Sequence, residues 1–191
     1  MIDKLGERIG FFALFFTMMS ISSSPHPMLL VLCYLIHEFG HVCLAKVTKV
    51  DMKKIKTGPF QLRLAYDSSF ASYKSELLVC AGGVLFNFLS AAVTLLFVEK
   101  SESASFFLIC NLSLGLMNLY PVSTLDGGRI FKCLLMMLFE VELALKIWKT
   151  VSFLFAFLLW LCAAYLLLVF DSNASLFFVS VFLLVELCFS A

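Results

Sequence analysis

Long apolar runs separated by short polar segments are the feature that most constrains how this chain can fold. Of its 191 residues, 62% are hydrophobic and 14% are charged, whereas a soluble domain averages about 45–50% and about 25%. Since about 20 apolar residues in a helix cross a bilayer, the sequence predicts an all-α polytopic membrane protein with about six transmembrane helices. The expected spans lie near Ile9–Ile21, Met28–Ala45, Leu77–Val98, Phe106–Tyr120, Val151–Phe170 and Leu176–Ser190.

The positions of lysine and arginine predict the topology. If the chain crosses the membrane six times, the segments between spans lie on alternate sides of the bilayer. Of the 14 basic residues, Lys100 alone then lies on one side, and the other 13 lie on the opposite side, most of them in Lys46–Glu76 and Pro121–Thr150. Positive charge favours the cytoplasmic side, so both termini are expected in the cytoplasm. The alternative is a cleavable signal peptide, because basic residues precede a short first run and Ser22–Ser24 are small.

The chain has no linker, low-complexity tract or internal repeat, so a single domain over 1–191 is expected. Within the soluble-like segment Lys46–Glu76, apolar residues from Phe60 to Tyr66 occupy alternate positions after a Gly58-Pro59 turn signal. This pattern predicts a short membrane-associated β-hairpin between the second and third spans. The seven cysteines form no Cys-x-x-Cys pair, which favours neither a disulfide framework nor a cysteine zinc site. A net charge of +1 gives no reason to expect nucleic acid as a partner.

Two of the three histidines bracket a glutamate in His37-Glu38-Phe39-Gly40-His41. On a helix, positions four apart share a face, so both imidazoles can reach one ion while Glu38 sits beside the attacking water. Chance produces this pattern in a chain of this composition on the order of once in a thousand. Ionisable groups within a span are costly and by default functional; the alternative is a polar cluster hydrogen-bonded to a neighbouring helix. His26, in Ser-Pro-His-Pro, is expected in a loop on the outer side.

Catalytic zinc usually takes three protein ligands and leaves one position for water. The best candidate for the third ligand is Asp126, an acidic residue on the cytoplasmic side just after the fourth span. Pro121 ends that span, and Gly127-Gly128 permit a close backbone approach. The alternative is an ordinary Asp-Gly turn.

These residues resemble the motifs of the site-2 protease family of intramembrane zinc metalloproteases. His37-Glu38-x-x-His41 matches the first motif, Asn118-x-x-Pro121 followed by Leu125-Asp126-Gly127-Gly128 is similar to the second, and Gly83-x-x-x-Asn87 is similar to the Gly-x-x-x-Asn motif. The resemblance implies one Zn²⁺ per chain, held by His37, His41 and Asp126, with Glu38 as general base. It further implies that Asn118, Pro121 and Asn87 contact substrate or support the site.

Within the family, the short six-span chain is most similar to the sporulation branch, typified by stage IV sporulation protein FB. This resemblance implies a bacterial cell membrane and a membrane-anchored substrate, such as a transcription or sigma factor precursor, cut in or beside its membrane segment. The lipid bilayer and a membrane regulatory protein are the other expected partners. His37 lies nine residues into the second span, so the active site is expected toward the cytoplasmic side.

Two other functions remain open from the sequence. A catalytically silent relative could act as a membrane scaffold or chaperone, although it would have no chemical need for all four of His37, Glu38, His41 and Asp126. A transporter or metal-handling channel would need further ionisable residues along the spans, and apart from Glu38 only the late Glu186 is found there. Glu186 either faces a cavity or lies near the cytoplasmic interface.

Overall fold

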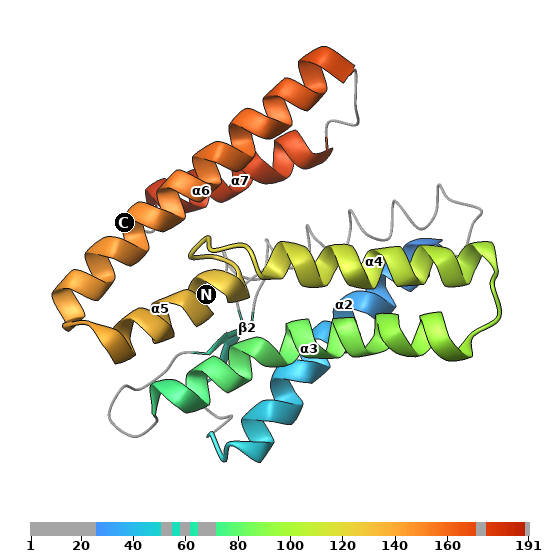
Figure 1. Ribbon diagram of the computed structural model, residues 1–191, viewed down its shortest axis with the longest axis horizontal. Coiled ribbons are helices and arrows are strands. Elements are labelled where there is room, and N and C mark those ends of the chain that lie inside the picture. Colours follow the sequence, from blue (N-terminus) through green and yellow to red (C-terminus); the bar gives the residue numbers. More distant parts are fainter. Residues whose placement is uncertain (1–25, 51–54, 58–61, 65–71, 171–174, 190–191) are drawn as a thin grey trace, which may run out of the picture. The chain divides into compact units, whose positions relative to one another are not determined.

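The structure, a computed structural model, describes residues 26–50, 55–57, 62–64, 72–170 and 175–189 (Figure 1). In chain order the elements are α2 (His26–Val47), β1 (Ile55–Thr57), β2 (Leu62–Leu64), α3 (Tyr73–Phe97), α4 (Glu102–Asn118), α5 (Asp126–Leu138), α6 (Val141–Phe170) and α7 (Ser175–Phe189). The chain divides into two compact units, Met1–Leu116 and Met117–Ala191.

The apolar runs fold as helices wherever the structure describes them. The expected spans from the second to the sixth each overlap one helix, in order α2, α3, α4, α6 and α7, and the first, Ile9–Ile21, lies outside the described residues. Among the described residues, three helices are long and apolar enough to cross a membrane, namely α2, α3 and Val141–Val169 of α6; Leu176–Val185 in α7 is a shorter apolar stretch. The chain is therefore a helical integral membrane protein, and the count of six spans stays a prediction.

In the first unit, α2 and α3 cross in close contact (Figure 1), and Gly40 and Gly82 lie at this contact. A Cβ atom at Gly82 would lie 2.5 Å from the carbonyl oxygen of Gly40, which is tighter than a side chain tolerates. Beside this crossing, the rings of Phe39 and Phe86 meet edge to face at 5.9 Å. Small residues let membrane helices approach until their backbones touch, and here that approach brings α3 against the histidine face of α2.

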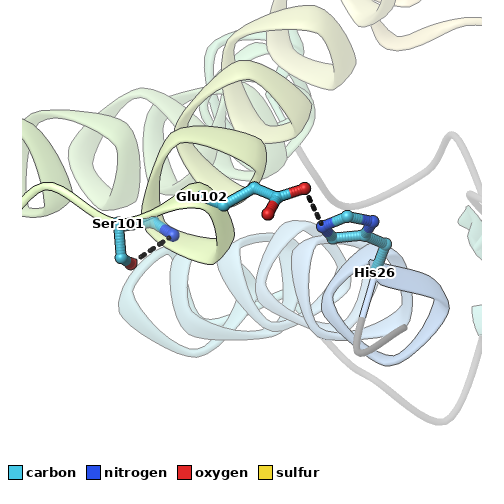
Figure 2. Close-up of polar contacts among 4 residues, drawn as sticks. His26, Ser101 and Glu102 are labelled. Atoms are coloured by element: carbon cyan, nitrogen blue, oxygen red, sulfur yellow. Dashed lines mark hydrogen bonds and ion pairs between the residues drawn. The ribbon is translucent and has the colours of Figure 1, made fainter. Parts of the chain in front are cut away.

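Helix α4 contacts α2 through polar groups. Asn111 is fully buried, and its Nδ2 donates to the carbonyl of Phe107 at 3.0 Å and to Cys33 Sγ at 3.1 Å. At the start of both helices, His26 Nε2 lies 3.9 Å from Glu102 Oε1 (Figure 2), and the imidazole stacks on Phe106.

The expectation of a loop at His26 is wrong, because His26 is the first residue of α2. Pro27 follows it directly. Proline is tolerated in the first turn of a helix, where its missing N–H has no partner to lose. The helix therefore starts two residues earlier than the apolar run predicts.

The two strands pair antiparallel, with Ile55 opposite Leu64, Lys56 opposite Arg63 and Thr57 opposite Leu62. The expected strand over Phe60–Tyr66 is thus seen at its centre, and the turn at Gly58-Pro59 lies outside the described residues. A hairpin associated with the membrane stays a prediction.

In the second unit, α6 packs against both α5 and α7 (Figure 1). A buried cluster of Val122, Ala156 and Leu183 joins the segment before α5 to α6 and α7. The Tyr120 hydroxyl donates to the carbonyl of Phe155 at 3.2 Å, which anchors the same segment on α6.

Helix α5 and the early start of α6 were not expected. The sequence indicates only a polar segment over Pro121–Thr150, whereas this range holds all of α5 and the first ten residues of α6. α5 is only 13 residues long, shorter than a span, so a search for bilayer-length runs misses it. It is amphipathic, with the charged Arg129 and Lys132 three residues apart and the apolar Cys133 and Leu135 buried.

Candidate metal centre

The two histidines of the first motif lie together on the buried face of α2. His37 and His41 are 4% and 9% exposed, and their Nε2 atoms are 3.2 Å apart. Two nitrogen ligands at about 2.0–2.1 Å from a tetrahedral zinc ion lie about 3.3 Å from one another. The spacing of the imidazoles therefore fits the binding of one zinc ion between them.

A main-chain contact fixes the ring of His41. Its Nδ1 lies 2.8 Å from the carbonyl oxygen of Val79 on α3. Because a carbonyl only accepts hydrogen bonds, Nδ1 carries the hydrogen and Nε2 presents its lone pair toward His37. Metal-binding histidines almost always donate their second ring nitrogen in this way, so the contact to Val79 gives His41 the orientation that a metal ligand needs.

Gly83 on α3 leaves room beside the two imidazoles. A Cβ atom at this position would lie 2.6 Å from Nε2 of both His37 and His41. Four residues later, Asn87 is fully buried, and neither its Oδ1 nor its Nδ2 has a hydrogen-bond partner among the described residues. The face of α3 that packs on the histidines thus combines a glycine, against which both imidazole tips lie closely, with a buried amide that can bind further atoms.

Glu38 lies on the same turn of α2 and is half-buried. The hydroxyl of Tyr34, one turn earlier on the helix, donates a hydrogen bond to its carboxylate. This contact restricts the rotation of the Glu38 side chain, as a base that must point at one water molecule requires.

In the second unit, Asp126 is the first residue of α5 and is 7% exposed. A carboxylate is favoured at a helix N-terminus, where backbone N–H groups and the helix dipole stabilise negative charge. The backbone of Leu125 donates to the carbonyl of Val122 at 2.9 Å. Asp126 therefore opens a helix rather than standing in an isolated Asp-Gly turn.

The paired glycines after Asp126 allow the close backbone approach that the sequence predicts, here between α5 and the segment before it. A Cβ atom at Gly127 would collide with the carbonyl of Leu119, and one at Gly128 with the carbonyl of Val122. The first turn of α5 is thus packed directly against the backbone of the segment that precedes it.

The remaining candidates divide between the units. The first unit carries His37, Glu38 and His41 on α2 and Asn87 on α3, whereas Asn118, at the end of α4, Pro121 and Asp126 lie in the second. His26 lies at the far end of α2 from the pair, and the side chain of Glu186 is outside the described ones.

Sequence reasoning missed the groups that support the candidates. The spacing of Tyr34 four residues before Glu38 is a signal that could have identified it, because such pairs share a helix face. The carbonyl of Val79 leaves no trace in the sequence, since any residue supplies one.

Two comparisons with known proteins bear on this geometry. The family description "Peptidase family M50" matches residues 98–162, a range that contains Asn118, Pro121 and Asp126. The solved structure titled "Site-2 Protease from Methanocaldococcus jannaschii" aligns over 95% of this chain and 86% of its own, with a TM-score of 0.64 and 22% sequence identity. A comparison with curated protein sequences finds no match.

The matched segment of this chain is thus similar to Peptidase family M50. The structural match, at its level of identity, establishes the shared fold. Together they confirm the resemblance of this chain to the site-2 protease family.

Proposed function

We propose that this protein is an intramembrane zinc metalloendopeptidase that hydrolyses a peptide bond in or beside the membrane segment of a membrane-anchored protein. The observation that carries the proposal is the pair of buried imidazoles on α2, whose Nε2 atoms are 3.2 Å apart. The contact from His41 to the carbonyl of Val79 and the close packing of both imidazole tips against Gly83 support it.

His37, His41 and Asp126 would hold one Zn²⁺ per chain. Two imidazoles and a carboxylate are a donor set that zinc favours in catalytic sites. Bound there, the ion would lower the pKa of a water molecule to about 7 and polarise the scissile carbonyl. Burial of all three side chains suits this chemistry, because electrostatic effects are stronger where bulk water is excluded.

Glu38 acts as general base and then as general acid. It accepts a proton from the attacking water and donates it to the leaving amine. The hydrogen bond from Tyr34 directs the carboxylate during both transfers.

Asn87, Asn118 and Pro121 are assigned to substrate contact or support of the site. Hydrolysis needs an exposed carbonyl, and a membrane helix hides its carbonyls in hydrogen bonds, so the substrate must locally unwind. Asn87 can bind the freed backbone groups, because its buried amide has no other partner among the described residues.

The extended substrate segment would add to the edge of the sheet. Within the described residues β2 pairs with β1 alone, and an exposed edge recruits extended peptides by main-chain hydrogen bonds. Substituting Leu62 or Leu64 with proline removes a backbone donor from β2 and is expected to abolish cleavage while zinc remains bound.

In the membrane, we place both termini in the cytoplasm and the site in the cytoplasmic half of a single six-span domain over 1–191. The bias of lysine and arginine to alternate segments supports this topology. The resemblance to the sporulation branch favours a bacterial cell membrane, a sigma or transcription factor precursor as substrate, and a membrane regulatory protein as partner.

The test compares newly formed protein N-termini in membranes of cells that express the wild type or Glu38→Gln. The substitution keeps the shape of the side chain and removes the base, so cleavage should fall by about 100-fold or more with zinc retained. Glu102→Gln, the same change at an exposed helix end, is the matched control. Equal sets of N-termini from wild type and Glu38→Gln, both metallated, would contradict the proposal and favour a silent scaffold.

A further inference from the structure

The first turn of α5 is also held from α6, by a tryptophan. Trp148 Nε1 donates to the carbonyl oxygen of Gly128 at 2.8 Å, two residues after Asp126. The ammonium group of Lys132, one turn further along α5, lies 4.9 Å from the centroid of the Trp148 ring. One side chain of α6 thus contacts α5 by a hydrogen bond to its backbone and by a cation–π interaction.

We propose that Trp148 is a positioning residue for Asp126, fixing the first turn of α5 so that the carboxylate keeps the position of a metal ligand. The inference rests on the proposed function, in which Asp126 binds zinc. It adds a residue that lies outside the motifs of the sequence and acts on the ligand only through the backbone.

The position of Asp126 is fixed from two directions. The backbone of the preceding segment contacts the backbone at Gly127 and Gly128 directly. Because no flexible side chain lies between them, the first turn of α5 cannot move toward that segment. Trp148, which is 22 residues away from Asp126 in the sequence, holds the carbonyl of Gly128 from α6. Removing the indole N–H leaves the ring to pack but frees the helix turn to shift. Metal sites are sensitive to such shifts, because ligand atoms must lie within about 0.5 Å of the productive geometry.

The second tryptophan of the chain provides a matched control. Trp160 is also on α6, and it packs against Phe157 of the same helix, with ring centroids 5.7 Å apart. Trp148→Phe and Trp160→Phe therefore remove the same indole from one helix, and among the contacts of the described residues only the first removes a hydrogen bond to α5.

The experiment measures the Zn²⁺ affinity of the full chain in detergent by competition with a chelator, together with thermal unfolding and the absorption spectrum of the Co²⁺-substituted protein. Trp148→Phe is expected to weaken zinc binding by about 3–10-fold, which corresponds to the net contribution of one hydrogen bond, and to shift the Co²⁺ bands. Trp160→Phe should change neither. Trp148→His, which retains a ring N–H donor, should bind zinc more tightly than Trp148→Phe.

Asp126→Asn separates this inference from the proposed function. If Asp126→Asn weakens zinc binding and Trp148→Phe does not, Trp148 has no positioning role and the ligand assignment stands. If Asp126→Asn binds zinc as the wild type does, the ligand assignment fails and the role of Trp148 fails with it. A drop in melting temperature of Trp148→Phe with unchanged zinc affinity and Co²⁺ spectrum would mark a purely structural residue and overturn the inference.

Discussion

The two parts of the proposed zinc site are built in different ways. On α2, His37 and His41 meet because they are one helical turn apart, and a single carbonyl from α3 orients one of them. In the second unit, Asp126 opens α5, and the first turn of that helix is held by backbone contacts at Gly127 and Gly128 and by Trp148 on α6. One half is determined by spacing within a helix, and the other by tertiary packing.

The largest effect should follow from removing one of the two histidine ligands on α2, which form the helix-borne half of the proposed site. His41→Ala deletes an imidazole already oriented by Val79, so zinc affinity should fall by at least about 100-fold, more than the about 10–100-fold cost of losing an outer partner. Metal content after dialysis against a chelator measures this. The third histidine gives the control, because His26→Ala lies at the start of α2 and should leave zinc bound. If His41→Ala lowered zinc affinity less than Asp126→Asn does, the histidine half would not be the stronger part of the proposed site, and the comparison between the two halves would be wrong.

Glycine substitutions should distinguish the two halves by what they damage. In Gly83→Ala the new methyl group meets the tips of both imidazoles, so zinc binding should weaken by about 5–150-fold, the equivalent of about 1–3 kcal/mol of overpacking. In Gly127→Ala the methyl group meets the carbonyl of Leu119, which cannot rotate away. We expect that variant to lose thermal stability first, and to lose zinc only as it unfolds.

Both variants need the same pair of readouts, zinc affinity and the melting temperature in detergent. Gly83→Ala should cause the larger loss of zinc affinity and the smaller drop in melting temperature. Gly127→Ala should cause the larger drop in melting temperature and the smaller loss of zinc affinity. If both variants lose stability equally and bind zinc equally, the distinction between a helix-borne and a packing-dependent half is wrong.

This difference between the two halves explains which parts of the proposed site can be predicted from the sequence. Helical periodicity predicts that His37 and His41 share a face, and the structure agrees because the information lies within five residues. Asp126 was singled out as an acidic residue on the right side of the membrane and by the resemblance of its motif. That it begins a helix was missed, because α5 is too short and too amphipathic to register as a span.

Contacts between residues that are far apart in the chain could not be predicted, because they leave no pattern in the sequence. The hydrogen bond from Trp148 to Gly128 joins two helices through a main-chain oxygen, and the carbonyl of Val79 could belong to any residue. The close approach at Gly127-Gly128 is the exception: two adjacent glycines indicate a place where side chains would collide, and the structure confirms it.

The smallest effect is expected at the start of α2, where His26 faces Glu102 (Figure 2). The side chain of Glu102 is 89% exposed and the two groups are 3.9 Å apart, so water screens the pair and its contribution to stability is about 0.2–1 kcal/mol at most. Glu102→Gln leaves the stacking of His26 on Phe106 intact, and unfolding in detergent should therefore shift by no more than that amount. Zinc affinity should not change, because His37 is eleven residues along the helix from His26, about 16 Å at 1.5 Å per residue. A loss of zinc in Glu102→Gln would show that the orientation of the whole of α2 depends on this contact, and the helical half of the site would then rely on distant packing as much as Asp126 does.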